Sequence, residues 1–577
     1  MAHENVQLLP ADLFHLVTAE LADRAIHAES QEAARPEYAA LCNCVLSSKY
    51  LASAGALSAL YRIALHDKCP VKSGGGENIS FAEQDVAVMK WSILWRTIIL
   101  SALGKTMYPY CRHLRELDLK DLSFLLDRIN DSPKYRSKVA KQFFSGHLER
   151  FHFTSQARNK SRTVAKAVML DIKSILLAVG DEITKQSPLI EALSEPSTSD
   201  VLITALPIWT PRLEHLRELE FWDGKLLADE TVRDLLHAHC PNLARLQLYT
   251  STNSDSDHCL AMFIGGLQPN TLVSFENNSS CGISTETMLA LNSHGERLSS
   301  LKLGLEEDGM LALGLLKDCV ALETLHVSSL RPSVDLKATQ NDVYADIVEW
   351  LKGCNRLKEV TFNDVVSAPD LLLPILNNAN VSLKSLTVKA KEDALYIVKD
   401  HHDFHKALKQ QKKLESLLLH ADADPVSRDD IEVLMDTLTA LESLNFLKLV
   451  RLSDYFSNEQ VNTLAQSLHR LETLYIGGYG ISDAVLPPVA CMESLKTVTF
   501  AGITAFTVDG LLDFVDCLPA NHVGFQLSIE AAVPETMLSE EGQDLVKDAL
   551  ATKMDGRFEY MPLRDPNVPE FDDSDSD

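Results

Sequence analysis

A six-residue pattern, Leu-x-x-Leu-x-Leu with Val, Ile or Phe accepted at the later positions, recurs along the chain and constrains its fold more than any other feature. Its copies start at Leu114, Leu216, Leu243, Leu298, Leu322, Leu357, Leu383, Leu414, Leu441, Leu471 and Leu495. Degenerate copies start at Leu148 and Leu272. From Leu216 onward, successive starts lie 24 to 35 residues apart. Such spacing indicates a repeat architecture in which each copy belongs to one supersecondary unit.

Strand geometry explains the pattern within each copy. Residues two apart on a β-strand point to the same face, so the last two apolar positions are buried together and their neighbours face outward. Segments with helical spacing lie between the copies, for example residues 228–239 and 460–468, and can return the chain on the other side. The sequence therefore predicts an α/β fold, a parallel β/α solenoid curved like a horseshoe.

Cysteines mark four of the copies at the same place. Cys111, Cys240, Cys319 and Cys354 each stand three residues before the first leucine. The segment Cys240-Pro-Asn-Leu-Ala-Arg-Leu-Gln-Leu resembles the cysteine-containing subclass of leucine-rich repeats, which is widespread in F-box proteins. Since the cysteines recur one per repeat and do not cluster, we expect packed, reduced thiols and neither metal ligands nor disulfides.

The N-terminal region lacks the repeat and has helical spacing. Leu9-Pro10 precedes an apolar helix, a second helix ends in Leu-Ser-Ser-Lys-Tyr50, and Leu60-Tyr61-Arg62 follows. Residues 7–65 thus resemble an F-box, particularly of the fungal type. They depart from that family in a longer interval over residues 23–36 and in having Tyr50 or Leu51 where the family often has Trp.

The F-box resemblance implies a docking partner, the Skp adaptor subunit of a cullin-RING ubiquitin ligase. The residues expected to bind it are Leu9, Pro10, Leu13, Phe14, Leu16, Val17, Leu46, Tyr50 and Leu51. About 50 residues cannot bury this many apolar side chains alone, so the module needs a partner. That partner is either the Skp subunit or the solenoid itself, which the helices would then cap.

These features divide the chain into five regions. An F-box-like helical domain is expected over 1–66, a Gly-rich loop and linker helix over 67–110, and first repeat strands with a basic helical insertion over 111–200. The leucine-rich-repeat solenoid follows over 201–562, and an acidic disordered tail over 563–577.

Charge narrows the classes of partner. The chain has 81 Asp+Glu against 54 Lys+Arg, a net charge of -27, which argues against binding to nucleic-acid backbones. Residues 134–173 are instead basic, with ten Lys+Arg and two Asp+Glu. We expect this segment to be an exposed helical insertion attracted to the acidic body of its own chain, or else a dock for an acidic or phosphorylated partner.

No segment predicts a membrane span or a secretory signal. The longest apolar stretch, residues 93–103, is short and contains Arg96. A cytoplasmic or nuclear protein with reduced cysteines is therefore expected.

Catalysis is not expected of this chain. Gly104-Lys105-Thr106 resembles the end of a phosphate-binding loop, but Ile99 stands where that loop needs glycine. His401 and His405 would share one face of a helix, and a solvated outer face explains them better than a metal site. We predict no catalytic residue, no cofactor and no metal.

The strand face opposite the helices is the better candidate for function, since packing does not fix its side chains. The outward positions expected to bind a protein client are Glu218, Glu220, Trp222, Arg245, Gln247, Tyr249, Lys302, His326, Asn363, Lys389, His420 and Tyr475. The resemblance implies a substrate-recognition adaptor of an SCF-type cullin-RING ubiquitin ligase. The alternatives are an interaction scaffold with no ubiquitin role and an enzyme that uses the histidine cluster.

Overall fold

The structure is a computed structural model that describes residues 10–28, 31–66, 81–156, 168–195, 200–253, 255–331, 334–390, 396–421, 426–519, 522–532 and 537–562. The chain divides into two compact units, residues 1–272 (unit 1) and 273–577 (unit 2). Leu9, the glycines of residues 73–77 and the acidic tail lie outside the described residues.

Unit 1 begins with a small helical module. Its elements are α1 (Ala11–Ile26), α2 (Gln31–Ser47), α3 (Lys49–Leu51), the π-helical turn η1 (Ala52–Ala56) and α4 (Leu57–His66). Pro10 directly precedes α1, as the sequence predicts, because proline is well accommodated where the first helical N–H groups have no partner. Small side chains such as Ala22, Ala25 and Ala59 form its core with Leu41 and Ile63, so the helices approach one another closely.

Helix α5 (Phe81–Ala102) follows and is fixed by a buried carboxylate. The indole N–H groups of Trp91 and Trp95 donate to Asp121 at 2.7 and 2.6 Å. Asp121 lies on α6 (Leu119–Asp131) and is 3% exposed. These bonds hold α5 against α6 of the first repeat.

Unit 1 continues with the first repeats. Its remaining elements are η2 (Tyr110–His113), β1 (Glu116–Asp118), α7 (Pro133–Phe143), η3 (Gly146–Phe151), β2 (Thr154–Gln156), β3 (Val168–Leu170), α8 (Ile172–Gln186), β4 (Ala192–Ser194), α9 (Val201–Trp209), η4 (Thr210–Arg212), β5 (Glu218–Asp223), η5 (Gly224–Ala228), α10 (Glu230–His239), β6 (Arg245–Thr250) and α11 (Ser256–Gly266). Four strands are parallel in the order β1-β4-β5-β6, and their register aligns Leu117, Leu193, Leu219 and Leu246.

In the part of unit 2 that the structure describes, the main sheet has eleven parallel strands, in the order β7-β8-β9-β10-β11-β12-β13-β14-β16-β18-β19. These strands are β7 (Ser274–Asn277), β8 (Ser300–Leu305), β9 (Thr324–Ser329), β10 (Glu359–Asn363), β11 (Ser385–Lys389), β12 (Ser416–His420), β13 (Phe446–Val450), β14 (Thr473–Ile476), β16 (Thr497–Phe500), β18 (Gln526–Ala532) and β19 (Arg557–Pro562). A separate parallel pair consists of β15 (Tyr479–Ser482) and β17 (Ile503–Ala505).

Helices and helical turns connect these strands. They are α12 (Thr285–Leu291), η6 (Asn292–His294), α13 (Glu307–Leu311), η7 (Leu313–Leu316), α14 (Leu336–Thr339), α15 (Asn341–Gly353), α16 (Ala368–Leu376), η8 (Val398–Asp400), α17 (His402–Leu408), α18 (Arg428–Leu438), α19 (Asn458–Ser467), η9 (Asp483–Val485), α20 (Leu486–Ala490), α21 (Val508–Cys517) and α22 (Glu540–Met554). Capping boxes at Ser427 and Ser457 start α18 and α19, since each side chain satisfies backbone N–H groups that the helix leaves open.

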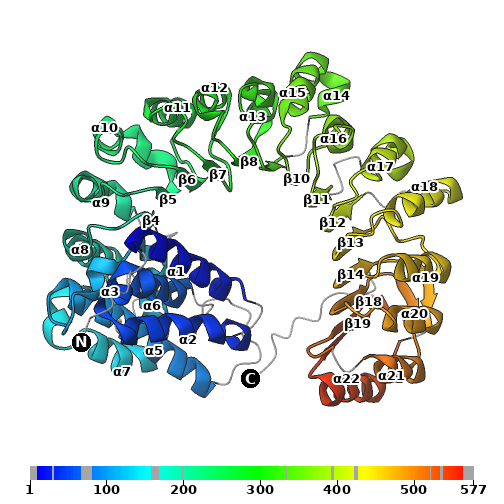
Figure 1. The fold of residues 1–577 in the computed structure, drawn as a ribbon, viewed down its shortest axis with the longest axis horizontal. Helices are drawn as coiled ribbons and strands as arrows, with labels where there is room; N and C mark the ends of the chain where they lie inside the picture. Colours follow the sequence, from blue (N-terminus) through cyan, green and yellow to red (C-terminus); the bar gives the residue numbers. More distant parts are fainter. Residues whose placement is uncertain are drawn as a thin grey trace, which may run out of the picture. The chain divides into compact units, whose positions relative to one another are not determined.

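Within unit 2 the strands line the inner side of an arc and the helices its outer side (Figure 1). One buried side chain per strand stacks on the next, for example Leu325, Val360, Leu386 and Leu417, and all four are at most 1% exposed. The predicted parallel β/α leucine-rich-repeat solenoid, preceded by an all-helical region, is confirmed.

The structure corrects several repeat assignments. The copy placed at Leu441 begins instead at Leu444, because β13 buries Leu447 and Leu449 in register with Leu474 and Ile476. The copy at Leu148 is wrong, since Leu148 lies in η3 and the following strand β2 pairs antiparallel with β3. Strands β4, β18 and β19 carry no full copy of the pattern and were not predicted.

The four repeat cysteines are buried as predicted. Cys111, Cys240, Cys319 and Cys354 are each at most 2% exposed. Burial raises the pKa of the Cys240, Cys319 and Cys354 thiols to about 12, because a thiolate is poorly solvated in an apolar interior. They act as small core residues.

Candidate interaction surfaces

The strands of each unit present rows of outward side chains on the face opposite the helices. In unit 2, the candidate residues lie in two of these rows, the middle row and the last row. The middle row runs from Glu276 through Lys302, His326, Thr361, Thr387, Leu418 and Lys448 to Tyr475. The last row, two residues further along each strand, contains Ser328, Asn363, Lys389, His420 and Val450.

In unit 1, the predicted outward residues come together on β5 and β6. Trp222 and Tyr249 stack with their ring centroids 4.9 Å apart, and the Gln247 amide donates to the Tyr249 hydroxyl at 3.3 Å. Trp222 remains 36% exposed. The result is a flat aromatic pair of the kind that anchors protein partners.

The acidic side chains beside this pair are largely neutralised within the chain. Glu218 pairs with Arg245, and Glu220 pairs with Lys120 of α6. The Lys120 ammonium also lies 5.8 Å from the centre of the Tyr249 ring. The exposed Glu218–Arg245 pair contributes little to stability, but both pairs fix the side chains around Trp222 and Tyr249.

Burial strongly raises the pKa of two carboxyl groups in unit 1. Burial, together with the neighbouring Asp118, raises the pKa of Glu116 on β1 to about 7. Burial also raises the pKa of Glu195 to about 7, although the carboxylate accepts hydrogen bonds from the backbone of Leu202 and Trp222. Glu195 therefore holds the start of α9 to the end of β5, next to the aromatic pair.

In unit 2, His326 and Asn363 lie in a polar cluster. The Asn363 amide donates to His326 Nε2 at 2.9 Å and to Ser328 Oγ at 3.1 Å. Lys302 pairs with Glu276 on the adjacent strand at 3.0 Å. Lys302, His326 and Asn363, which the repeat predicts as outward, thus occupy the neighbouring strands β8, β9 and β10.

Tyr475 is tied to its surroundings at two points. The Lys448 ammonium lies 4.1 Å from the centre of the Tyr475 ring, and the Tyr475 hydroxyl donates to Glu530 at 2.8 Å. Burial and this carboxylate raise the pKa of Tyr475 above its usual range. Tyr475 is thus a partly buried support for Lys448.

Sequence reasoning missed Lys448, Lys120, Glu530 and Glu195. Lys448 was missed because starting the repeat at Leu441 puts this lysine beyond the motif, whereas starting at Leu444 makes it the fifth residue. The alternation Phe525, Leu527, Ile529 could have revealed β18 and hence Glu530. Lys120 and Glu195 lie in a helix and a strand end that the motif does not reach.

The predicted adaptor-binding residues of the N-terminal module divide into two sets. Leu13, Leu16 and Val17 are 52%, 64% and 52% exposed, and Leu46 is 84% exposed. Phe14 packs against the core of the module. Tyr50 and Leu51 are half-buried and Pro10 is exposed.

Other side chains of the same module contact the first repeat. The Ser58 hydroxyl donates to the backbone carbonyl of His113. Burial, and then the charge of Arg115 on the repeat side, lower the pKa of His15. One side of the module therefore caps the first repeat, while Leu13, Leu16 and Val17 of α1 remain more than half exposed.

The histidine cluster differs from the solvated helix face expected of it. His405 is fully buried, and its Nε2 lies 3.3 Å from the Tyr396 hydroxyl. Burial lowers the pKa of His405 to about 3. His402 instead pairs with Asp430 at 2.6 Å. In the described ranges, no group of three or more His, Cys, Asp or Glu side chains could hold a metal ion.

The basic segment 134–173 is only partly the helical insertion expected. It contains α7 and η3, but also the antiparallel strands β2 and β3; residues 157–167 lie outside the described part of the chain. Lys134 pairs with Asp85. Arg150 pairs with Glu182 on α8 at 3.2 Å.

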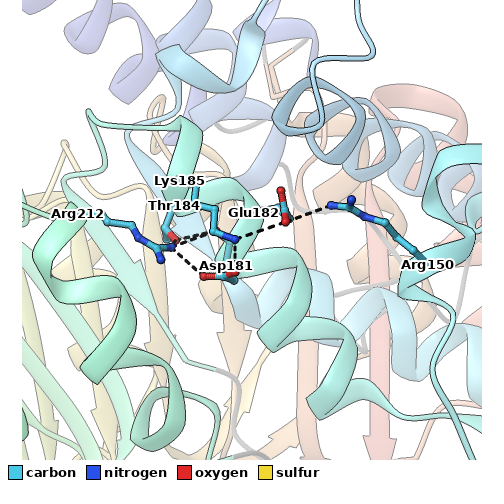
Figure 2. A network of polar contacts seen from close by, with 6 residues as sticks. All are labelled: Arg150, Asp181, Glu182, Thr184, Lys185 and Arg212. Atoms are coloured by element: carbon cyan, nitrogen blue, oxygen red, sulfur yellow. Dashed lines mark hydrogen bonds and ion pairs between the residues drawn. The ribbon is translucent and has the colours of Figure 1, made fainter.

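That pair belongs to a network on α8 (Figure 2). Lys185 bridges Asp181 and Glu182, and Arg212 reaches Asp181 at 2.8 Å. Two of the basic side chains in the segment are thus attracted to acidic groups of their own chain, as the first of the two expectations states.

No described helix has both the length and the apolar character to cross a bilayer.

Comparisons with known proteins give structural neighbours only. No protein family and no curated protein matches the sequence. A crystal structure of an internalin from Listeria monocytogenes is 12% identical, with a TM-score of 0.32, over 66% of this chain and 92% of the internalin chain. TLR13, in its complex with ssRNA13, is 16% identical, with a TM-score of 0.33, over 67% of this chain and 53% of the TLR13 chain. Both are leucine-rich-repeat proteins, but the fold assigned here rests on the strand register.

Proposed function

We propose that this chain is a non-catalytic substrate-recognition adaptor of an SCF-type cullin-RING ubiquitin ligase. Its N-terminal module would dock the Skp adaptor subunit, and the outward strand face would hold a protein client. Other subunits would carry the chemistry, while this chain would bring a client lysine close to activated ubiquitin. Placement in the cytoplasm or nucleus belongs to the same proposal.

The observation that carries the proposal is the exposure of four large apolar side chains on the module. Leu13, Leu16 and Val17 follow helical spacing on α1, and Leu46 lies near the end of α2. Burying one fully exposed side chain of this size contributes roughly 1.5–3 kcal/mol, so these four, which are already partly buried, together contribute roughly 4–8 kcal/mol before the cost of association. Capping of the first repeat uses other residues and leaves these available.

The test is the affinity of the purified full chain for the purified Skp adaptor subunit, measured by titration calorimetry. Leu13→Asp with Leu46→Asp should abolish binding, because two charges would replace apolar contacts at the docking surface. The matched control is Leu289→Asp with Leu545→Asp, two leucines 50% and 56% exposed on α12 and α22. This control should bind as the wild type does.

Two outcomes would reject the docking assignment. One is no binding by the wild-type chain, and the other is equal binding by both double variants. The coarser function, a leucine-rich-repeat interaction scaffold with protein partners and no ubiquitin role, would then be the better description.

A further inference from the structure

A strip of the outward face of unit 2 is cationic although the chain as a whole is strongly acidic. From β8 to β13, the middle and last rows contain three lysines and two histidines: Lys302, Lys389, Lys448, His326 and His420. The same two rows contain no Asp or Glu over these strands. In a chain of net charge -27, this local excess of positive charge is a distinct feature of one face.

The lysines of this cationic strip are only partly neutralised. Lys302 pairs with Glu276 of β7 at 3.0 Å. Lys448 lies over the Tyr475 ring, and Lys389 is exposed at the end of β11. Over the residues that the structure describes, neither Lys389 nor Lys448 pairs with a carboxylate. Two ammonium groups of the strip therefore remain available to an anion.

The pKa values of the two histidines reflect the lysines around them. The pKa of His326 is lowered by burial first and then by Lys302 and Lys389, with Glu276 acting in the opposite direction. The pKa of His420 is lowered by burial first and then by Arg451, Lys389 and Lys448, with Asp364 opposing. Lys389 acts on both rings, so the lysines of β8, β11 and β13 contribute to one positive field.

Neutral hydrogen-bonding groups lie between the lysines. Thr361 and Thr387 occupy the middle row between His326 and Lys448. The Asn363 amide and the Ser328 hydroxyl stand in the last row. Hydroxyl and amide donors beside ammonium groups are the composition that binds carboxylate or phosphate oxygens.

Strand spacing sets the size of the ligand. Parallel strands lie ~4.8 Å apart, and the last row lies ~6.8 Å (two residues) along the strands from the middle row, so the Cα of Lys389 is roughly 16 Å from that of Lys302, three strands away, and roughly 12 Å from that of Lys448, two strands away. An extended peptide advances ~3.4 Å per residue. Anionic side chains about four residues apart, which point to the same side of an extended peptide, would therefore meet the three lysines in turn.

We propose that the cationic strip on β8 to β13 binds an extended anionic segment of the client polypeptide, whose carboxylates or phosphates contact Lys302, Lys389 and Lys448. This inference rests on the proposed function only in taking a protein client as the occupant of the face. A peptide is favoured over a nucleic acid because the positive charges are few and discrete and the rest of the chain is acidic, which repels a long polyanion.

Fluorescence anisotropy with labelled synthetic nonapeptides tests the proposal on the full-length chain. One peptide carries Glu at its first, fifth and ninth positions with Ser and Gly between, and a second carries phosphoserine at those positions. A third carries Gln there. Both anionic peptides should bind at least about tenfold more tightly than the Gln peptide, and added salt should weaken them. The tighter of the two identifies which anion the strip prefers.

Matched variants locate the binding. Lys389→Gln with Lys448→Gln should weaken the anionic peptides at least about tenfold. Lys358→Gln with Lys384→Gln removes the same charge from lysines that precede β10 and β11 and pair with Glu323 and Glu415; this control should bind as the wild type does. Equal weakening in both variants, or equal binding of the Gln peptide, would overturn the proposal.

Two further measurements distinguish peptide binding at the cationic strip from nucleic-acid binding and from docking of the Skp subunit. A mixed-sequence oligonucleotide that bound more tightly than either peptide, with the same dependence on Lys389 and Lys448, would overturn the assignment to a peptide. If the wild-type chain binds the Skp subunit but not the anionic peptides, the proposal for the strip is rejected and the docking proposal stands. If it binds the anionic peptides but not the Skp subunit, the docking proposal is rejected and the proposal for the strip stands.

Discussion

Replacing Glu195 by glutamine tests how a buried carboxyl group supports the strand end next to Trp222. Glu195 is 3% exposed. Its two oxygens accept hydrogen bonds from the backbone N–H of Leu202 at 2.8 Å and of Trp222 at 3.1 Å. Burial outweighs both bonds and raises its pKa from 4.5 to about 7. The folded chain therefore holds a proton on Glu195 more tightly than the unfolded chain does.

The sign and size of the effect follow from that difference. A carboxyl group whose pKa is higher in the folded chain stabilises the fold fully below its unfolded pKa, and this contribution is lost as the pH rises through the folded pKa. One pKa unit corresponds to about 1.4 kcal/mol, so the whole loss is roughly 3 kcal/mol. About 2 kcal/mol of it falls between pH 5.5 and 8. Glu195→Gln removes this dependence, at a constant cost of about 1 kcal/mol for one hydrogen bond.

The assay is urea denaturation of both proteins, followed by far-UV circular dichroism from pH 5.5 to 8. The free energy of unfolding of Glu195→Gln should rise relative to the wild type by about 2 kcal/mol over this range. The pKa of Glu116 is also near 7, but Glu116 is present in both proteins and cancels in the comparison. Glu149→Gln, at an exposed position on η3, controls for the loss of one charge. A difference that stays constant with pH would refute the reasoning.

Three further predictions concern packing. Gly180→Ala should destabilise the chain by about 1–2 kcal/mol, because the new Cβ would lie 2.2 Å from the buried Trp209 ring and overpacking outweighs the gain in helix propensity. The control Gly265→Ala, whose new Cβ would have nothing within 4 Å, should be neutral or stabilising. Thermal unfolding of the two variants compares these effects. Asp121→Leu should cost about 2–5 kcal/mol, since Trp91 and Trp95 lose their common acceptor; an unchanged unfolding midpoint would contradict this. Iodoacetamide at pH 8 should label Cys42, Cys491 and Cys517, which are exposed, and spare the native thiols of Cys240, Cys319 and Cys354, as peptide mass spectrometry would show.

The repeat strands could be predicted because each buries apolar side chains at the fixed spacing of the pattern. Strand β4 could not, because its three residues bury Leu193 alone, and a single leucine carries no periodicity. The start of β13 was misplaced because Leu441 and Leu444 both satisfy the pattern. Only the register with Leu474 distinguishes them.

The outward positions were also predictable, but their partners were not. Alternation along a strand identifies Glu218 and Arg245 as outward. Their pairing could not be predicted, because it depends on how two strands align across a connection of variable length. The burial of His405 was missed for a similar reason. It packs against Tyr396, outside its own helix, and helical spacing alone does not reveal such a neighbour.

Hydrogen–deuterium exchange of the full chain, with and without the Skp adaptor subunit, tests the central claim most directly. The account predicts slower exchange in α1 and near Leu46 when the adaptor is present, with β8 to β13 unchanged. Complex formation that slows exchange only on the repeat strands and leaves α1 as it was would contradict it.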